Sequence, residues 1–300
     1  MNIQWYPGHM TKAKRAMKED IKLIDLIIEL VDARAPVSSR NPDIDDLAGN
    51  KARMVLLNKA DLAGERGNDA WVSWFRDQGL QAVKLDSRSR AGLKQIQAAV
   101  LEACKEKTER DRKRGILNRP VRAMVVGIPN VGKSTFINSY AGKACARTGN
   151  KPGVTKGNQW IRLNKSLELL DTPGILWPRF ESQEVGMHLA LIGSINDQIL
   201  DGEQLAMELI ILLMDRYPEV LGERYGFENI EKETTGQGDI LTHQEAAGIL
   251  EKIGTVRGCL IKGGECDRKK ASDLLLDDFR SGRLGRITLE FPEEPEKSVG

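Results

Sequence analysis

The chain has 300 residues, of which 40% are hydrophobic and 29% charged, and its net charge of +2 does not by itself indicate a nucleic-acid-binding protein. Its four cysteines form no Cys-x-x-Cys pair and its three histidines are not clustered near them, so neither a zinc site nor a disulfide scaffold is expected. Because the apolar runs are too short to span a bilayer and the N-terminus lacks a signal-peptide core, we expect a cytoplasmic protein without a membrane partner.

The first two thirds of the chain have the pattern of alternating strands and helices. Apolar runs predict strands at residues 25–33, 52–60, 80–87 and 121–130, and a strand pair at 158–163 and 166–174. Helical patterns cover residues 69–78 and 92–107, and a further helix begins near Lys133. This α/β pattern predicts a mostly parallel sheet with helices on both faces.

After about residue 195 the pattern becomes helical. Apolar residues recur at helical spacing in three segments, and only the stretch RITLEF, residues 286–291, has a strand-like pattern. The predicted organisation is a basic N-terminal segment at 1–20, an α/β domain at 21–190 and a small all-helical domain at 195–300. The three helical segments are residues 202–217, 242–254 and 267–282.

The stretch GIPNVGKS, residues 127–134, matches the phosphate-binding pattern G-x-x-x-x-G-K-[ST] in full and lies between a predicted strand and a predicted helix. Its glycines let backbone N–H groups turn toward phosphate oxygens, and the helix N-terminus adds its positive dipole end. Lys133 is expected to reach the β- and γ-phosphates, and Ser134 to bind Mg²⁺. The residues expected to line the phosphates are Asn130, Val131, Gly132, Lys133, Ser134 and Thr135.

A second phosphate-linked motif, DTPG, occupies residues 171–174 after an apolar strand. Asp171 is expected to hold the Mg²⁺ shell through water, and the Gly174 N–H to meet the γ-phosphate. Thr155 lies between the two motifs and is the predicted switch threonine, with its hydroxyl on Mg²⁺ in the triphosphate state. The alternative is an ordinary loop threonine.

The stretch VLLNKADL, residues 55–62, ends in a guanine-reading pattern. The Asp61 carboxylate can accept hydrogen bonds from guanine N1–H and the exocyclic amine, a donor pair that adenine lacks. Asn58 can bridge toward the loops and the base, and the Lys59 stem can lie over the ring. The loop DSRS at 86–89 can present a backbone N–H near Ser87 or Arg88 to guanine O6, although a plain turn is the alternative.

The order of these motifs is unusual, because the base reader precedes the phosphate loop. A binding site depends on how its residues are arranged in space and not on their order in the sequence. A circular permutation would therefore preserve the site while relocating the chain ends. The basic stretch at 105–122 is where the former ends would be joined. The loop after Gly174 then leads directly into the C-terminal domain, and we hypothesise that nucleotide-driven movement there displaces that domain.

Basic residues also gather in local stripes. Residues 1–18 and 143–165 carry no acid, and residues 105–122 hold eight basic and three acidic side chains. Such stripes suggest a face for a polyanion, whereas a solvated surface is the plainer explanation. Trp5, Tyr6 and Trp160 could stack on bases, but packing in the core is the more frequent fate of aromatic residues.

This combination resembles the circularly permuted GTPases, and within them the ribosome biogenesis GTPase A (YlqF/RbgA) family. The resemblance covers nearly the whole chain and rests on WYPGHMTKA, VDARAP, LLNKADL, GIPNVGKST, PGVT and LLDTPGILWP. It implies a GTP-hydrolysing assembly factor that binds the precursor of the large (50S) ribosomal subunit and its rRNA in the GTP state and leaves after hydrolysis. It also implies stimulation by K⁺, with Asn130 matching the asparagine associated with that ion, and GTP and GDP as substrate and product.

The resemblance bears on catalysis too. Many GTPases carry a water-orienting Gln after D-x-x-G, but this chain has Ile175 there. In proteins similar to this one the proposed replacement is the histidine of PGHM, which is His9. The alternative is that His9 packs or contacts RNA. A partner that orders the loops would then act as activator.

Two other functions stay open from the residues. A P-loop small-molecule kinase would share the phosphate site but has no need for the base reader. A signalling switch acting on a protein partner would share every nucleotide motif. We expect a monomer that does not bind DNA. The expectation that the C-terminal domain binds RNA rests mainly on the family resemblance.

Overall fold

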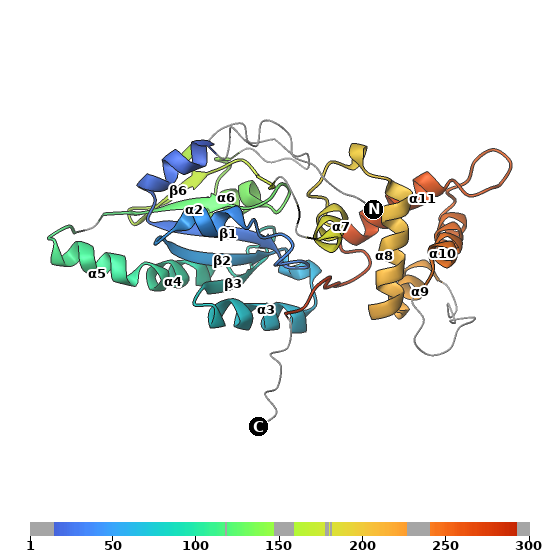
Figure 1. The fold of residues 1–300 in the computed structure, drawn as a ribbon, viewed down its shortest axis with the longest axis horizontal. Coiled ribbons are helices and arrows are strands. Elements are labelled where there is room, and N and C mark those ends of the chain that lie inside the picture. The colour runs from blue at the N-terminus through green and yellow to red at the C-terminus, as the bar shows by residue number, and fades with distance from the viewer. Residues whose placement is uncertain are drawn as a thin grey trace, which may run out of the picture. The chain divides into compact units, whose positions relative to one another are not determined.

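The computed structural model describes residues 15–117, 119–146, 159–177, 180, 182–226 and 241–292. The chain forms two compact units (Figure 1). The first, which we call the α/β unit, contains the described residues up to Leu189 and those from Thr288 onward. The second, which we call the helical unit, runs from Ala190 to Ile287.

The α/β unit is built on a six-stranded sheet with the order β3-β2-β1-β4-β6-β5. All neighbouring strands pair in parallel except β5 and β6, which are antiparallel. β1 is buried at every position, as expected for a central strand covered on both faces. The strands are β1 (Leu26–Asp32), β2 (Ala52–Asn58), β3 (Gln81–Leu85), β4 (Val121–Val126), β5 (Gln159–Arg162) and β6 (Leu167–Asp171).

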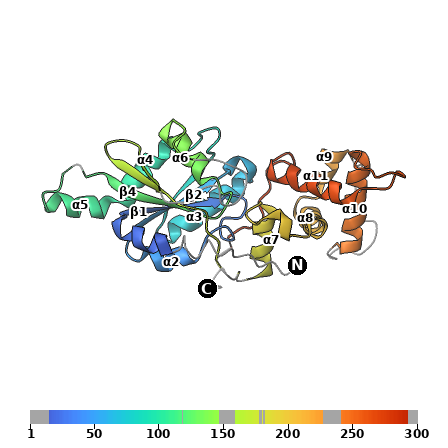
Figure 2. The same cartoon turned by 90° about the horizontal axis from the view of Figure 1, so that it is seen from above.

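Helices cover both faces of this sheet, which confirms the predicted α/β class. Figure 2 shows α4 and α6 over one face and α2 over the other. Trp71 and Phe75 of α3 pack against Val55 and Leu57 of β2, and each such buried side chain contributes roughly 1.5–3 kcal/mol. The helices are α2 (Asp43–Ala48), α3 (Glu65–Asp77), α4 (Leu93–Ala103), α5 (Lys105–Lys113), α6 (Lys133–Ala141) and α7 (Gln183–Leu191), with 3-10 turns η1 (Ile21–Leu23) and η2 (Ala60–Leu62).

The basic stretch at 105–122 differs from the expected linker, because it begins with the helix α5. The predicted helix at 92–107 breaks at Cys104, and α5 follows directly. None of the side chains of α5, all of which the structure describes, is buried. An i,i+4 ion pair between Lys107 and Asp111, with 3.0 Å between Nζ and Oδ2, supports the helix instead of packing.

The helical unit is organised around α8, whose leucines 205, 209 and 213 are buried. Three of its helices, α8, α10 and α11, begin at side-chain caps that the sequence encodes: Asp201 accepts from the Gln204 N–H, Asp267 accepts from the Lys270 N–H, and Thr242 and Glu245 form a capping box. None of the helices described in either unit is long and apolar enough to cross a membrane. The helices are α8 (Gly202–Arg216), α9 (Glu219–Tyr225), α10 (His243–Val256) and α11 (Arg268–Arg280), preceded by the turn η3 (Asp197–Ile199).

The stretch 286–291 does not form the strand that its pattern suggested. It is an extended tail, and from Thr288 it belongs to the α/β unit, whereas the sequence placed all of 195–300 in the helical domain. The Leu289 N–H donates to the Arg34 carbonyl at 2.8 Å, and the Trp71 indole N–H donates to the Glu290 carbonyl at 2.9 Å. These bonds join segments far apart in sequence, so the local pattern could not reveal them.

Candidate nucleotide site

The phosphate loop connects β4 to α6 with the geometry that its glycines require. Gly132 has a φ of 100°, and a Cβ built there would lie 2.4 Å from Nδ2 of Asn58, so only glycine fits. α6 begins at Lys133, whose side chain is 7% exposed. Its Nζ donates to the carbonyls of Gly127 and Ile128, both at 2.9 Å. The ammonium is therefore held over the loop where phosphate oxygens are expected.

Lys133 and Asp171 form a buried pair of opposite charge behind this loop. Burial lowers the pKa of Lys133 to about 8, against the opposing effect of Asp171. Burial likewise raises the pKa of Asp171 to about 6, against the opposing effect of Lys133. A bound phosphate would therefore stabilise the charged form of Lys133, and a bound cation would stabilise the charged form of Asp171.

The residues at this point also fit a Mg²⁺ ion. The Asp171 side chain is buried, and its Oδ1 has no hydrogen-bond partner within the described part of the chain. Mg²⁺ takes hard oxygen ligands and usually keeps several waters. A buried carboxylate oxygen of this kind, at the end of β6, suits the water-bridged role predicted for Asp171. Ser134, which the sequence predicts to bind Mg²⁺, lies in the first turn of α6.

We expect GTP binding at pH 8 to take up protons. With its pKa at about 8, Lys133 is partly neutral in the free protein, and the bound phosphates favour its charged form. The uptake should approach roughly half a proton for each GTP bound. Isothermal titration calorimetry in Tris and in HEPES measures it, because the observed enthalpy then rises with the ionisation enthalpy of the buffer. Equal enthalpies in the two buffers would contradict the pKa assigned to Lys133.

The DTPG segment lies directly against the phosphate loop. A Cβ built on Gly174 would lie 2.8 Å from the backbone of Pro129 and 2.9 Å from Nζ of Lys133, so the close approach requires glycine. Thr172 Oγ1 donates to the Val125 carbonyl at 2.7 Å and fixes the segment to β4. Ile175 follows with its side chain 4% exposed. A buried apolar side chain cannot orient the water molecule that attacks the γ-phosphate in GTPases, so another group would have to orient it.

Asn58 connects the base-reading segment to both of its neighbouring loops. Its Nδ2 donates to the Val131 carbonyl in the phosphate loop at 2.8 Å. Its Oδ1 accepts from the Ser87 hydroxyl at 2.7 Å and the Ser87 N–H at 3.2 Å. One buried amide therefore holds together three segments that are separated by 29 and 73 residues. This is the bridging toward the loops that the sequence predicts for Asn58.

Lys59 is held by a buried ionic network that the motifs did not reveal. Its Nζ donates to Asp32 Oδ2 at 2.8 Å. Arg34 donates from Nε and Nη2 to the two carboxylate oxygens of Asp32, both at 2.9 Å. Burial alone would raise the pKa of Asp32, but Arg34 and Lys59 lower it far below its usual range. The signal in the sequence was an Asp at the end of a buried strand, in the stretch VDARAP.

Asp61, which follows Lys59 in the base-reading segment, and Arg88, in the loop after β3, are both exposed. Partial burial and the nearby carboxylate of Asp86 raise the pKa of Asp61 above its usual range. The Arg88 N–H donates to Asp86 Oδ1 at 2.8 Å, which shapes the loop after β3. A carboxylate in this position is available to a base, as the guanine-reading role requires.

The predicted site residues that the structure describes lie on neighbouring loops at one edge of the sheet, at the carboxyl ends of β2, β3, β4 and β6. Ligands bind at this edge in open α/β sheets. His9 and Thr155, as well as Trp5 and Tyr6, lie outside the described residues. The base-reading segment after β2 and the DTPG segment after β6 are thus brought to the same end of the sheet by the order of the strands. The described site residues are Asn58, Lys59, Asp61, Ser87, Arg88, Asn130, Val131, Gly132, Lys133, Ser134, Thr135, Asp171 and Gly174.

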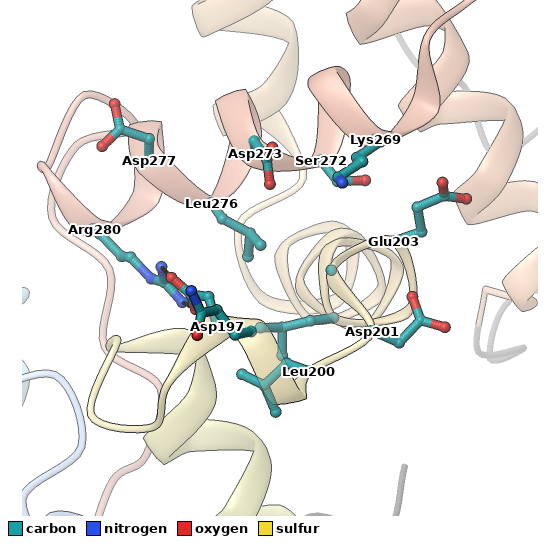
Figure 3. A pocket seen from close by; sticks show the side chains of 13 residues that line it. Asp197, Leu200, Asp201, Glu203, Lys269, Ser272, Asp273, Leu276, Asp277 and Arg280 are labelled. Carbon is teal, nitrogen blue, oxygen red and sulfur yellow. Dashed lines mark hydrogen bonds and ion pairs between the residues drawn. The ribbon is translucent and has the colours of Figure 1, made fainter. Parts of the chain in front are cut away.

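A hollow of about 600 Å³ lies within the helical unit and has a different chemistry. Figure 3 shows it between η3, the start of α8 and one side of α11. Its acidic side chains outnumber its basic ones, and Arg280 is already paired with Asp197 at 2.8 Å. Such a lining repels phosphate, so this hollow is not a nucleotide site. The charged residues that line it are Asp197, Asp201, Glu203, Lys269, Asp273, Asp277 and Arg280.

The chain resembles known proteins along almost its full length. Residues 122–245 match a family described as 50S ribosome-binding GTPase. Ribosome biogenesis GTPase A from Bacillus cereus is 47% identical over 294 residues, which are 98% of this chain and 95% of that protein. The chain belongs to the ribosome biogenesis GTPase A family. Ribosome biogenesis GTPase A from Thermotoga maritima is 30% identical and covers 97% of this chain, which in turn covers 95% of it.

A solved member of the ribosome biogenesis GTPase A family shares this fold. The crystal structure of GNP-bound YlqF from Thermotoga maritima matches with a TM-score of 0.62 and 27% identity, over 95% of this chain and all of that one. The match confirms a circularly permuted GTPase domain followed by helices. As a GTPase of this family, the protein binds guanine nucleotide with Mg²⁺ and hydrolyses GTP.

Proposed function

We propose that the protein assembles the large ribosomal subunit, binding the precursor and its rRNA in the GTP state and leaving after hydrolysis. The observation that carries this proposal is the Asn58 amide, which joins the guanine-reading segment to the phosphate loop in a chain related throughout its length to ribosome biogenesis GTPases. A site that reads guanine and phosphate together is what a nucleotide-controlled assembly step requires.

In the proposed mechanism, water attacks the γ-phosphorus and GDP departs with the bridging oxygen. Lys133 and the N-terminus of α6 stabilise the negative charge on the phosphate oxygens. Ser134 and Thr155, with Asp171 through water, would hold Mg²⁺, which neutralises charge on the β- and γ-phosphates. The Gly174 N–H contacts the γ-phosphate and loses this contact after hydrolysis, so the change reaches the chain that leads into the helical unit.

The proposal is tested by measuring GTP hydrolysis with and without purified large subunits, in K⁺ and in Na⁺. Stimulation by subunits in K⁺ is expected, because an activating partner would order the groups that orient the attacking water and a cation near Asn130 would add positive charge at the phosphates. Indifference to subunits would overturn the assembly role, and equal rates in K⁺ and Na⁺ would overturn the K⁺ site alone. Lys133→Ala serves as the inactive control, because it removes the cation at the phosphates.

The two alternatives give different results in the same assays. A small-molecule kinase would bind ATP as tightly as GTP, which a base reader with Asp61 opposes. A signalling switch for a protein partner would not co-sediment with large subunits in a GTP-dependent and salt-sensitive manner. We propose the assembly factor, acting as a cytoplasmic monomer without DNA binding, over both.

His9 is proposed to orient the attacking water or accept its proton, since Ile175 is buried and apolar. His9→Ala should lower subunit-stimulated hydrolysis by about 10²-fold or more while leaving GTP affinity unchanged. Full stimulated activity in His9→Ala would remove this role. His9→Gln is the matched variant, because an amide can still orient water and should retain part of the rate.

A further inference from the structure

An exposed tryptophan marks a hollow at the outer edge of the sheet in the α/β unit. β5 is the edge strand, and its Trp160 is 42% exposed. Trp71 and Trp177, by contrast, are buried in the described part of the chain. The hollow beside Trp160 measures about 300 Å³. Its lining consists of Leu23, Arg122, Trp160, Arg162 and Glu168.

Strand register explains why these side chains share one face. Arg162 of β5 and Arg122 of β4 both pair with Glu168 of β6, and Trp160 lies two residues before Arg162. Side chains alternate between the faces of a strand, so these four project to the same side. Leu23 in η1 borders the hollow and is 51% exposed. The lining is thus fixed by the sheet and is not formed by a single loop.

The electrostatics of the hollow suit an anionic ligand with a flat ring. The Arg122 guanidinium lies over the Trp160 ring, with its Cζ 5.5 Å from the ring centroid. Glu168 Oε2 lies 3.4 Å from Arg122 Nε and helps to orient it. Arg162 adds a second cation to the lining, which contains this single carboxylate. Exposed aromatic and basic side chains arranged in this way are typical of surfaces that stack single-stranded bases and hold their phosphates.

We propose that the hollow around Trp160 binds an unpaired RNA nucleotide, whose base stacks on the indole and whose phosphate is held by Arg162. The inference rests on the proposed function and names one surface through which the protein would contact rRNA. Duplex RNA keeps its base faces stacked inside the helix, so it cannot supply the ring. Because Trp160 lies five residues after the predicted switch residue Thr155, RNA bound here holds the strand that directly follows the switch segment.

The test is fluorescence anisotropy with a labelled ten-nucleotide single-stranded RNA and with the same sequence as a duplex. Trp160→Ala should weaken single-strand binding about tenfold, because stacking of one base is lost. Trp160→Phe should retain most of the affinity, and duplex binding should change little in both variants. GDP affinity should stay unchanged, since Trp160 lies outside the described nucleotide site.

A matched pair of arginine variants separates a local contact from general charge. Arg162→Gln and Arg112→Gln each remove one exposed positive charge, and Arg112 lies on α5, outside the hollow. Arg162→Gln should weaken single-strand binding several-fold more than Arg112→Gln at the same salt concentration. Equal effects would show that only the overall field matters and would overturn the proposed site.

Co-sedimentation with large subunits distinguishes failure of this inference from failure of the proposed function. If the wild-type protein binds subunits and Trp160→Ala binds both subunits and RNA as well as wild type, the inference fails alone. If Trp160→Ala loses subunit binding but keeps its RNA affinity, the hollow binds a protein and the inference is again overturned. If the wild-type protein does not bind subunits at all, the proposed function fails, whatever the oligonucleotides show.

Discussion

Asp61→Asn is expected to change the preference of the site from guanine to xanthine nucleotides. The carboxylate accepts from guanine N1–H and from the exocyclic amine, whereas an amide offers one acceptor and one donor. Xanthine carries a carbonyl in place of that amine, so it suits the amide. Losing two charge-assisted hydrogen bonds should lower GTP affinity by about 10²–10⁴-fold.

Competition between GTP and XTP for a fluorescent nucleotide measures this change. Asp77→Asn, an exposed carboxylate at the end of α3, is the control and should leave the preference unchanged. If Asp61→Asn binds GTP as the wild type does, the base is read by other groups.

The raised pKa of Asp61 predicts a pH dependence of GTP binding. GTP affinity should weaken as the pH falls, because a protonated Asp61 carboxyl group would place its own hydrogen-bond donor against the donors of guanine.

Asp32→Ala is expected to destabilise the α/β unit by about 3–5 kcal/mol. Removing this carboxylate leaves the buried Arg34 guanidinium without its main counter-charge, because both oxygens of Asp32 accept from it. Lys59 loses the acceptor that positions it beside the base reader. Urea unfolding, followed by tryptophan fluorescence, measures the loss of unfolding free energy.

A double variant serves as the control for this experiment. Asp32→Ala with Arg34→Met removes both members of the buried pair and should recover part of the lost stability, because no uncompensated guanidinium is left. A loss below about 1 kcal/mol in the single variant would mean that the network is better hydrated than its burial indicates. Arg53→Met should cost less, because the buried Glu29 carboxylate with which Arg53 pairs keeps Arg40 as a second partner.

Most of the α/β unit could be predicted because its signals are local. Apolar runs gave the strands within a few residues, and the phosphate and base motifs end the strands that the structure shows. The bridging of Asn58 toward its neighbouring loops could also be predicted, because this asparagine stands in the guanine-reading pattern NKAD. The sequence predicted a mostly parallel sheet, but the order of its strands came only from the structure.

The parts that escaped prediction depend on partners distant in sequence. In the sequence, Asp32 resembles any acidic residue at the end of a strand. Its role depends on hydrogen bonds from Arg34 and from Lys59, which follows the next strand, and these bonds are visible only in the structure. Trp160 could not be assigned to core or surface, because the period of an edge strand does not tell which face is covered. α5 escaped because a highly charged stretch without apolar periodicity gives no helical signal, although i,i+4 pairing sustains it.

The extended tail from Thr288 onward determines how the two units are connected along the chain. Because residues from Thr288 onward return to the α/β unit, the helical unit is an insertion with two tethers, and not an appendage with one. One tether leaves downstream of the DTPG segment, and the other returns to Arg34, beside the network that holds Lys59. A fragment ending at Leu189 would therefore be an incomplete GTPase, lacking the partners of Trp71 and Gly64. Dissection of this protein should retain both tethers, for example by replacing Ala190–Ile287 with a short linker.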